Sequence, residues 1–387
     1  MKARFDYKDL FMVIAQQKFI PALRFLEFAE EWEYKQIGSI CEIKTGDKDT
    51  KNKVTDGNFP FFVRSDNVER IDTYSYDGEA ILTSGDGVGV GKNFHYYKGK
   101  FDFHQRVYCL RNFKQSVSGR FIYEIFSERF FRRVIRLSAK NSVDSVRIEM
   151  IAKMEIAVPS IYEQQKIAAF LSSVDTKIEQ LSKKKSLLEQ YKKGVMQKLF
   201  SQEIRFKDDQ GNDYPSWKSN VIGALFVVSA GGDIEKVHSR SIKDDIFCYP
   251  VYANSEKAKG LHSYSDQYRI DQDCITVSGR GTLGVAHARF EKFFPIVRLL
   301  VLIPKEECDL IFFEHAVNVV HIFNESTGVP QLTAPQLTKY RLDYPIVQEQ
   351  QKIANFLSII DKKIELVVEQ IKQIQAFKKG LLQQMFV

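Results

Sequence analysis

The chain has 387 residues, of which 44% are hydrophobic, and a formal net charge of +7. This composition is ordinary for a folded protein and excludes a disordered chain, and the length allows two domains with full cores. The basic excess favours a polyanionic partner. Five scattered cysteines without a CxxC pair exclude a disulfide framework and a zinc site, which fits a reducing cytoplasm. The apolar run at residues 10–15 is too short for a membrane span.

A first globular domain is predicted over residues 21–160, after an N-terminal extension, residues 1–20, to which no role is assigned. The domain is rich in Phe, Tyr, Val and Ile, and Gly, Asp and Asn interrupt it frequently. Such a pattern is typical of a mixed, strand-rich fold. Its last segment, residues 154–159, is strand-like and ends in a proline.

A glycine-rich run at residues 85–92, Gly-Asp-Gly-Val-Gly-Val-Gly-Lys, raises the question of nucleotide binding. A phosphate-binding P-loop needs a glycine five residues before its last glycine, and Ser or Thr after the lysine. Asp86 and Asn93 occupy these two places instead. The run is therefore interpreted either as a glycine turn between two strands or as a loop whose backbone amides approach a phosphate.

The helix predicted over residues 161–200 carries a heptad pattern. Its large apolar residues recur at alternating steps of four and three, which is typical of a coiled coil. At roughly 1.5 Å per residue, residues 161–199 of this helix span about 58 Å, and a lone helix of that length cannot bury its apolar stripe. We therefore expect a second helix to cover it. The seam is predicted to consist of Ile167, Leu171, Val174, Ile178 and Leu181.

The second half of the chain repeats the first. A second globular domain is predicted over residues 201–345 and a second helix over residues 346–387. The hexapeptide Glu-Gln-Gln-Lys-Ile-Ala at 163–168 returns at 349–354, an offset of 349 − 163 = 186 that also relates Asp175 to Asp361. The helices match closely and the globular domains only in outline, so the globular domains are the parts able to recognise two different things. The second seam is predicted to consist of Ile353, Leu357, Ile360, Ile364 and Val367.

The chain resembles the specificity subunits of type I restriction–modification systems from about residue 23 to residue 386. The resemblance rests on the doubled hexapeptide helices, on their Pro-x-x-x-Glu-Gln-Gln lead-ins at Pro159 and Pro345, on a doubled Lys-Lys-Gly, and on Leu-Arg-Phe or Ile-Arg-Phe followed by Trp. It implies an α+β fold in which two mixed, strand-rich target recognition domains are separated by two long helices. These helices would form an antiparallel coiled coil with a pseudo-two-fold internal repeat. Residues 1–20 depart from the family pattern.

The same resemblance implies a function. Each target recognition domain would read one half of a bipartite sequence in double-stranded DNA, and the coiled coil would set the spacer between the halves. Two methyltransferase (modification) subunits would dock on the helices, and motor–nuclease (restriction) subunits would join them. S-adenosylmethionine, ATP and Mg are then expected on the partner subunits, with no cofactor on this chain. Because the two domains differ, we expect an asymmetric target, read by a cytoplasmic protein with no membrane contact.

Polar side chains near the ends of predicted strands are the candidate DNA contacts. Arg favours guanine and Asn favours adenine in the major groove, and Lys suits phosphate. For each of them a solvated loop residue is the alternative, which the sequence leaves open. The segments 142–147 and 327–332 would return towards DNA or pack under the helix starts. The candidates are Lys53, Arg64, Ser65, Asn67, Ser84, Asp86, Lys92, Arg106, Asn254, Ser255, Lys257, Ser278, Arg280 and Thr282.

No catalytic motif is present. The sequence has no HExxH, no nucleophile elbow and no methyltransferase tetrapeptide, and its seven histidines show no metal-ligand spacing. We therefore expect a non-catalytic DNA specificity subunit without a metal. Two alternatives stay open: a stand-alone DNA methyltransferase or nuclease with a doubled recognition unit, and a coiled-coil scaffold that binds only proteins. Binding to duplex DNA that weakens steeply with salt would separate the first interpretation from the scaffold.

Overall fold

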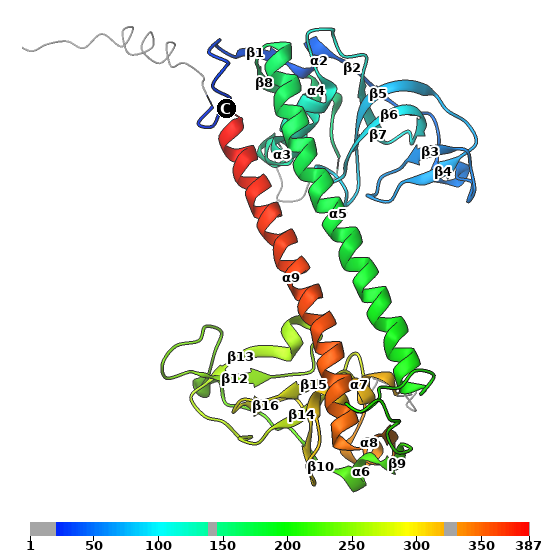
Figure 1. Cartoon of the computed structure of the whole chain (residues 1–387). Helices are drawn as coiled ribbons and strands as arrows, with labels where there is room; N and C mark the ends of the chain where they lie inside the picture. The colour runs from blue at the N-terminus through cyan, green and yellow to red at the C-terminus, as the bar shows by residue number, and fades with distance from the viewer. Residues whose placement is uncertain (1–20, 138–144, 321–330, 387) are drawn as a thin grey trace, which may run out of the picture. The chain divides into compact units, whose positions relative to one another are not determined.

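The computed structural model describes residues 21–137, 145–320 and 331–386 (Figure 1). The N-terminal extension, residues 1–20, lies outside the described residues. The chain divides into two units: unit 1 combines residues 1–181 with residues 370–387, and unit 2 comprises residues 182–369. Two long helices, α5 (Ile161–Phe200) and α9 (Val347–Met385), each begin in one unit and end in the other.

Unit 1 contains a six-stranded sheet with the strand order β2-β7-β5-β6-β3-β4, and a separate pair formed by β1 and β8 (Figure 1). All contacts in the large sheet are antiparallel except the one between β3 and β6. The strands are β1 (Glu33–Gln36), β2 (Glu42–Thr45), β3 (Phe59–Phe62), β4 (Glu69–Ile71), β5 (Tyr76–Ser84), β6 (Phe94–Phe103), β7 (Val107–Arg111) and β8 (Glu155–Val158). The shorter helical elements are α2 (Ile37–Ile40), η1 (Thr50–Asn52), α3 (Gly119–Leu137) and α4 (Ile148–Ala152).

The core of unit 1 lies between this sheet and α3. Phe121, Phe126 and Phe130 recur along one face of α3 and are fully buried, as their spacing of five and four residues on a helix allows. Phe126 and Phe130 stack on each other with ring centroids 4.5 Å apart. Trp32, which follows the chain's first described loop, packs edge-on against Phe121. Aromatic residues therefore dominate the burial that holds the sheet to the helix layer.

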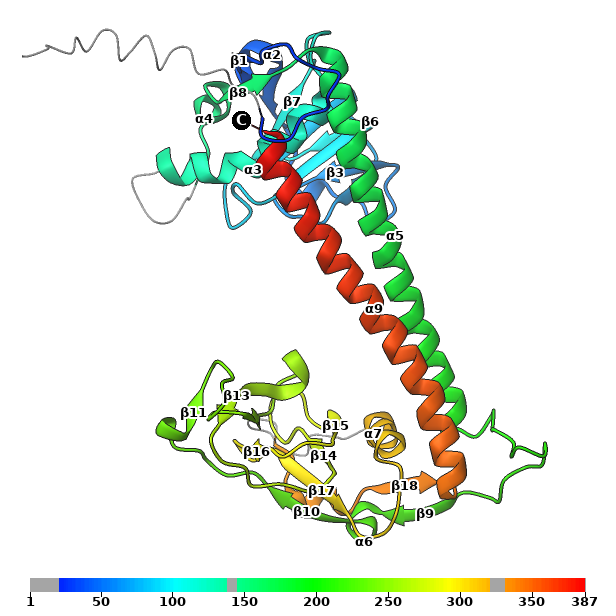
Figure 2. The ribbon, with the colours of Figure 1, turned by 60° about the vertical axis from the view of Figure 1, so that its left-hand side comes forward.

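Unit 2 repeats this arrangement with shorter strands (Figure 2). Its sheets have the orders β10-β17-β14-β15, β11-β13-β12-β16 and β18-β9. The strands are β9 (Lys218–Val221), β10 (Phe226–Ala230), β11 (Ser239–Arg240), β12 (Tyr249–Tyr252), β13 (Leu261–Ser265), β14 (Cys274–Val277), β15 (Ala286–Arg289), β16 (Phe294–Pro295), β17 (Leu300–Pro304) and β18 (Arg341–Tyr344). The helical elements are α6 (Ile222–Leu225), η2 (Lys236–His238), η3 (Lys257–Gly260), α7 (Leu310–Val319) and α8 (Ala334–Leu337).

The two large sheets correspond strand by strand. The long β6 of unit 1 pairs with β5 over most of its length and with β3 at its end. In unit 2 two separate strands correspond to β6: β15 pairs with β14, and β16 pairs with β12. One sheet in unit 1 therefore matches two sheets in unit 2. The predicted mixed α+β fold with an internal repeat is confirmed, as is the strand predicted at residues 154–159, which forms β8; β18 occupies the matching place before α9.

The repeated hexapeptides fasten each long helix to its own globular domain. In unit 1 Glu163, whose side chain is fully buried, accepts two hydrogen bonds of 2.7 Å from the guanidinium of Arg24. In unit 2 Glu349 accepts two such bonds, of 3.1 and 2.6 Å, from Arg205. A bidentate pair of this kind fixes both position and orientation. The arginine near the start of each domain thus makes the same contact with the glutamate of the hexapeptide in both units.

The glutamine after each of these glutamates completes the attachment. Gln164 donates to the carbonyl of Pro159 at 2.8 Å and accepts from the backbone amide of Ser118 at 2.9 Å. Gln350 donates to the carbonyl of Pro345 and accepts from the amide of Asp309 at the same two distances. Each glutamine therefore satisfies backbone groups at the start of α3 or α7, which would otherwise be buried without a partner.

Within each unit, the beginning of one long helix contacts the end of the other. In unit 1 the ammonium of Lys378 lies 2.7 Å from the carboxylate of Asp175. In unit 2 Lys192 lies 2.5 Å from Asp361. The predicted seam residues are buried, apart from Ile178 and Ile364, which are half-buried. Those at the start of each helix also belong to the core of their own globular domain, together with apolar residues from the end of the other helix.

Candidate nucleic-acid interface

The loop after β5 in unit 1 is held in place by backbone hydrogen bonds on both sides. The amide of Gly85 donates to the carbonyl of Arg106 at 2.7 Å, and the amide of Val146 donates to the carbonyl of Gly85 at 2.7 Å. A side chain at position 85 would place its Cβ 2.8 Å from the Arg106 carbonyl oxygen, so only glycine fits without a shift. The predicted glycine turn between two strands is confirmed.

The corresponding loop in unit 2 has the same construction. The amide of Leu332 donates to the carbonyl of Gly279 at 2.9 Å, and a Cβ at Gly279 would lie 2.8 Å from the Leu332 carbonyl oxygen. Single β-bridges join Asp86 to Ser145 in unit 1 and Arg280 to Gln331 in unit 2. The described parts of the predicted segments 142–147 and 327–332 therefore brace these loops. Residues 142–144 and 327–330 lie outside the described residues.

Three predicted contact residues of unit 1 converge at this loop. The guanidinium of Arg64, from the end of β3, lies 2.8 Å from one oxygen of Asp86. The guanidinium of Arg106 lies 3.8 Å from the other oxygen. Both arginines are exposed, whereas the Asp86 side chain is only 23% exposed. One carboxylate thus holds two exposed guanidinium groups side by side, at the rim of an open pocket of about 550 Å³.

Neighbouring side chains fix the backbone that carries these arginines. Asn93 donates to the carbonyl of Arg64 at 3.2 Å, and a ring nitrogen of His95 lies 3.1 Å from the carbonyl of Ser65. The amide of Arg106 donates to Nδ1 of His104 at 2.9 Å. Burial lowers the pKa of His104, and the nearby charge of Arg64 lowers it further. His104 therefore stays neutral and accepts this bond at neutral pH.

The structure places the other unit 1 candidates differently. Ser84 is buried and accepts a hydrogen bond from Asn93, so its hydroxyl is not presented to a ligand. Ser65 donates to the carbonyl of the exposed Asn67. Lys53 is paired with Glu69 on β4, and Lys92 stands over the ring of Phe131 on α3. The candidate set thus separates into one central cluster and scattered surface residues.

In unit 2 several candidates support the loop itself. Asn254 accepts from the amide of Gly279 at 2.7 Å and donates to the carbonyl of Val297 at 2.6 Å, so its amide is occupied. The hydroxyl of Ser278 accepts from the amide of Val285 and donates to the carbonyl of Thr282. Thr282 itself is exposed. Polar side chains at these positions act as internal struts of the loop.

The remaining unit 2 candidates are available to a ligand. Among the described residues Arg280 has no ionic partner; its backbone forms the bridge to Gln331, and its side chain is half-buried. Ser255 accepts from the amide of Lys257 at the start of η3. Lys257 is exposed. Side chains without an ionic partner in the protein are those that base edges and phosphates can engage.

The repeat pairs these central positions across the two units. Arg64 follows β3 as Asn254 follows β12, and Asp86 corresponds to Arg280 in the braced loop. Arg106 corresponds to Arg298, a residue that our sequence analysis missed. Val297 and Arg298 have φ angles of +54° and +59°, which are unusual for residues with side chains and commonest at functional sites. The two loops therefore have the same backbone arrangement and carry side chains of different charge.

No group of three or more His, Cys, Asp or Glu side chains that could hold a metal ion occurs in the part of the chain that the structure describes. No described helix is long and apolar enough to cross a membrane. All five cysteines are free, and burial raises the pKa of the Cys41, Cys109 and Cys274 thiols to about 12. These thiols are therefore unreactive as ligands or nucleophiles.

Comparison with known proteins gives a consistent result. The family model of the type I restriction modification DNA specificity domain matches the chain twice, over residues 29–190 and 216–376. A Mycoplasma pneumoniae protein that bears the name of a type I specificity subunit is 29% identical over 365 residues, covering 90% of this chain and 96% of its own. The specificity subunit of the Escherichia coli type I restriction enzyme EcoDI is 24% identical over 212 residues, covering 55% of this chain and 45% of its own.

Two solved structures show the same fold. The crystal structure of a type I restriction–modification S subunit from M. genitalium aligns with a TM-score of 0.69 at 17% identity, covering 95% of this chain and 99% of that chain. A chain from a structural study of complex assembly in the type I restriction–modification system aligns with a TM-score of 0.55 at 11% identity, covering 93% and 99%.

Proposed function

Because the chain belongs to the family of type I restriction–modification DNA specificity proteins, we propose that it reads a bipartite, asymmetric sequence in double-stranded DNA. As a specificity subunit it is the recognition component and not the catalytic one. Each unit contacts one half-site through its braced loop. The observation that carries this proposal is that the two loops have the same backbone arrangement, while Arg280 in unit 2 stands where Asp86 stands in unit 1.

The chemistry of the two loops favours different bases. In unit 1 the Arg64 and Arg106 guanidinium groups flank a carboxylate, an arrangement that offers donors to guanine and an acceptor to cytosine. In unit 2 Arg280 has no such acidic neighbour among the described residues and offers donors alone. Two readers of unlike chemistry at matched positions require two unlike half-sites. The target is therefore asymmetric.

The long helices would set the distance between half-sites. In unit 1 the start of α5 contacts the end of α9, and in unit 2 the start of α9 contacts the end of α5. These two end contacts support the proposal that α5 and α9 pair in an antiparallel coiled coil. Half-sites on the same face of the duplex would then lie about one helical turn, roughly 34–36 Å, apart.

The proposed working form is an assembly in the cytoplasm. Two methyltransferase subunits dock on the helices, motor–nuclease subunits join them, and S-adenosylmethionine, ATP and Mg bind to those partners. The five free thiols of this chain, two of them buried, agree with a reducing compartment. The name of the second solved structure concerns assembly of a type I restriction–modification system, which supports a multi-subunit form.

Mapping DNA methylation tests this function. A host that expresses the chain with its methyltransferase subunits should gain methylation at one split, non-palindromic motif, and the host that lacks the chain should not. Methyl transfer by the purified chain alone would instead indicate a stand-alone enzyme. Failure of the chain to bind duplex DNA at low salt would indicate a scaffold that binds only proteins.

A further inference from the structure

Unit 1 contains an open cleft of about 690 Å³ that the proposed DNA contacts do not use. One wall consists of residues from β3 and β6, and the other is the stretch of α5 at residues 172–179. The aromatic side chains that line it are Phe62, Phe94, His95, Tyr96, Tyr97 and Tyr123. Clefts of this size with aromatic walls and a few polar groups are typical binding sites.

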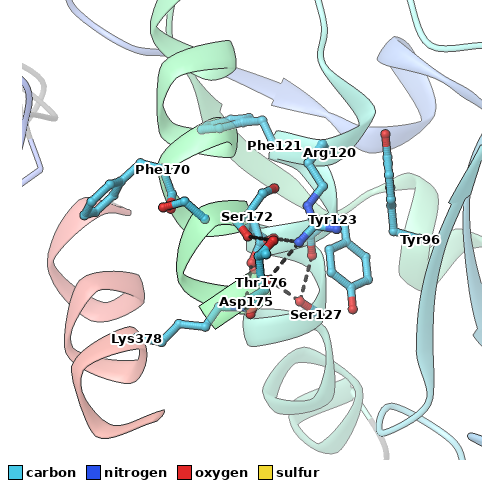
Figure 3. A network of polar contacts seen from close by, with 12 residues as sticks. Tyr96, Arg120, Phe121, Tyr123, Ser127, Phe170, Ser172, Asp175, Thr176 and Lys378 are labelled. Carbon is cyan, nitrogen blue, oxygen red and sulfur yellow. Dashed lines mark hydrogen bonds and ion pairs between the residues drawn. The ribbon is translucent and has the colours of Figure 1, made fainter. Parts of the chain in front are cut away.

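At the inner end of the cleft Asp175 meets Arg120 and Lys378 (Figure 3), and both cations also contact the carboxylate of Glu124, so the charges balance. Asp175 on α5 receives the ammonium of Lys378 at 2.7 Å and the guanidinium of Arg120 at 2.8 Å. The guanidinium of Arg120 lies 5.1 Å from the ring centroids of both Tyr96 and Tyr123. Each charge at this end already has a partner, so the inner end needs no ligand.

The outer end carries an uncompensated carboxylate. Glu179 is exposed on α5, and it has no ionic partner among the residues that the structure describes. Across the cleft the half-buried ring of Tyr97 packs on Phe62, which is itself buried, with ring centroids 5.5 Å apart. Val68, in the loop after β3, is 43% exposed at the cleft rim. An aromatic surface opposite a carboxylate suits a cation, whereas the carboxylate repels a phosphate.

The internal repeat identifies the counterparts of these residues in unit 2. Strand pairing matches β3 to β12, because Phe62 pairs with the end of β6 as Tyr252 pairs with β16. It matches the first part of β6 to β15, because these strands pair with β5 and β14. The offset of 186 residues matches the two long helices. By these registers, Phe62, Tyr97 and Glu179 correspond to Tyr252, Arg289 and Glu365.

In unit 2 the chain itself supplies two cations to this place. The guanidinium of Arg289, which is 6% exposed, lies 3.6 Å from the ring centroid of Tyr252. It also donates to the carbonyl of Lys259 in η3. The ammonium of Lys259 lies 3.4 Å from the carboxylate of Glu365 on α9. The aromatic ring and the helix carboxylate that correspond to the two sides of the unit 1 cleft are thus both occupied by basic groups.

The difference arises from the loop and from one residue. The segment between β12 and β13, residues 253–260, is longer than its counterpart between β3 and β4, residues 63–68. Ala258 and Lys259 adopt φ angles of +50° and +52°, which turn the longer segment back on itself. In unit 1 the shorter loop has no equivalent turn, and Tyr97 replaces the arginine.

We propose that the unit 1 cleft binds a basic segment of a partner protein. This proposal rests on the proposed function, in which the chain works in an assembly with modification subunits. The segment places a guanidinium against the half-buried Tyr97 ring and a second cation on Glu179, much as Arg289 and Lys259 meet Tyr252 and Glu365 within unit 2. A partner that binds once at each unit is therefore held differently at its two sites.

The test measures how many modification subunits the purified full-length chain binds, by native mass spectrometry and by titration. Glu179→Lys reverses the charge at the cleft, and Glu365→Lys makes the same change at the matched position of unit 2. We expect the wild-type chain to bind two modification subunits. Glu179→Lys should weaken one of the two binding steps by about tenfold or more. Glu365→Lys should leave both steps within about twofold, because an exposed pair contributes little.

A photo-crosslinking side chain at Thr176, which lines the cleft, gives a second readout. We expect it to label a Lys- or Arg-containing peptide of the modification subunit when DNA is present and when it is absent. Equal binding by Glu179→Lys and the wild-type chain would overturn the proposal, and so would crosslinks to DNA only. A wild-type chain that binds neither DNA nor modification subunits would refute the proposed function and this inference with it.

Discussion

Lys378 and Lys192 occupy the same position of the repeat, yet Lys378→Met should destabilise unit 1 far more than Lys192→Met destabilises unit 2. The ammonium of Lys378 lies 3.3 Å from the carboxylate of Glu124, whose side chain is 1% exposed, and 2.7 Å from Asp175. Burial raises the pKa of Glu124, and Lys378 opposes that rise. Methionine keeps most of the apolar stem of lysine and removes the charge.

The magnitudes follow from what each substitution leaves unpaired. Without Lys378, two carboxylates share the single guanidinium of Arg120, and breaking a buried pair in this way costs about 3–5 kcal/mol. Lys192 faces Asp361, whose side chain is 38% exposed, and a pair of that exposure contributes at most about 1 kcal/mol. We expect the free energy of local unfolding to fall by about 3 kcal/mol in unit 1 and by about 1 kcal/mol in unit 2. These losses correspond to roughly 150-fold and fivefold increases in the equilibrium constant for local opening.

Hydrogen exchange read by mass spectrometry measures these openings separately in peptides from α3 and from α7. Adding Glu124→Gln to Lys378→Met should recover part of the lost protection, because removing both charges of a buried pair costs less than removing one. Equal losses of protection in the two units would contradict the reasoning. So would a double variant that is less protected than Lys378→Met alone.

Three further outcomes are expected. Asp86→Arg, which copies Arg280, should change the first half-site in methylation maps and leave the second half-site as it was; a change in both would count against separate readers. Deleting one heptad from each long helix, residues 182–188 and 368–374, should shorten the spacer by about 3 base pairs, since seven residues span about 10 Å; an unchanged spacer in footprints would contradict the coiled-coil ruler. Burial lowers the pKa of His315, and Lys192 lowers it further, so the unfolded chain takes up a proton below about pH 6.5 that unit 2 does not. Protection of α7 should therefore fall as the pH drops below 6.5, and His315→Gln should flatten that dependence; an equally steep fall in the variant would show that other groups cause it.

The repeat made the architecture predictable from the sequence. The hexapeptide, the strand-like segments before it and the heptads all depend on local spacing, which one chain displays twice. The residues that fasten the helices were visible in the same comparison but were not assigned a role. Arg24 and Arg205 recur at the start of each domain, and Lys192 and Lys378 interrupt the apolar seam. A charged residue that recurs where an apolar one is expected signals a carboxylate partner on another element.

The loops could not be predicted to the same depth. Asn254 and Ser278 have side chains suited to reading bases, yet Asn254 hydrogen-bonds to backbone groups of two other loops and Ser278 to those of its own loop. Arg289 was not distinguished from a surface arginine, because its burial depends on a turn formed some thirty residues earlier in the chain. Contacts of this kind depend on which loops meet in three dimensions. Local sequence carries no record of them.

The division of unit 1 between the two ends of the chain affects how the protein is made. Leu381, Met385 and Phe386 belong to the same core as Trp32 and the aromatic face of α3. A ribosome that has translated the first half of the message has therefore not yet delivered every part of that core. Unit 2, which is continuous in sequence, can finish folding first. Removing residues 370–386 would consequently damage the core of unit 1, whose other residues precede them in sequence by some 200 positions or more.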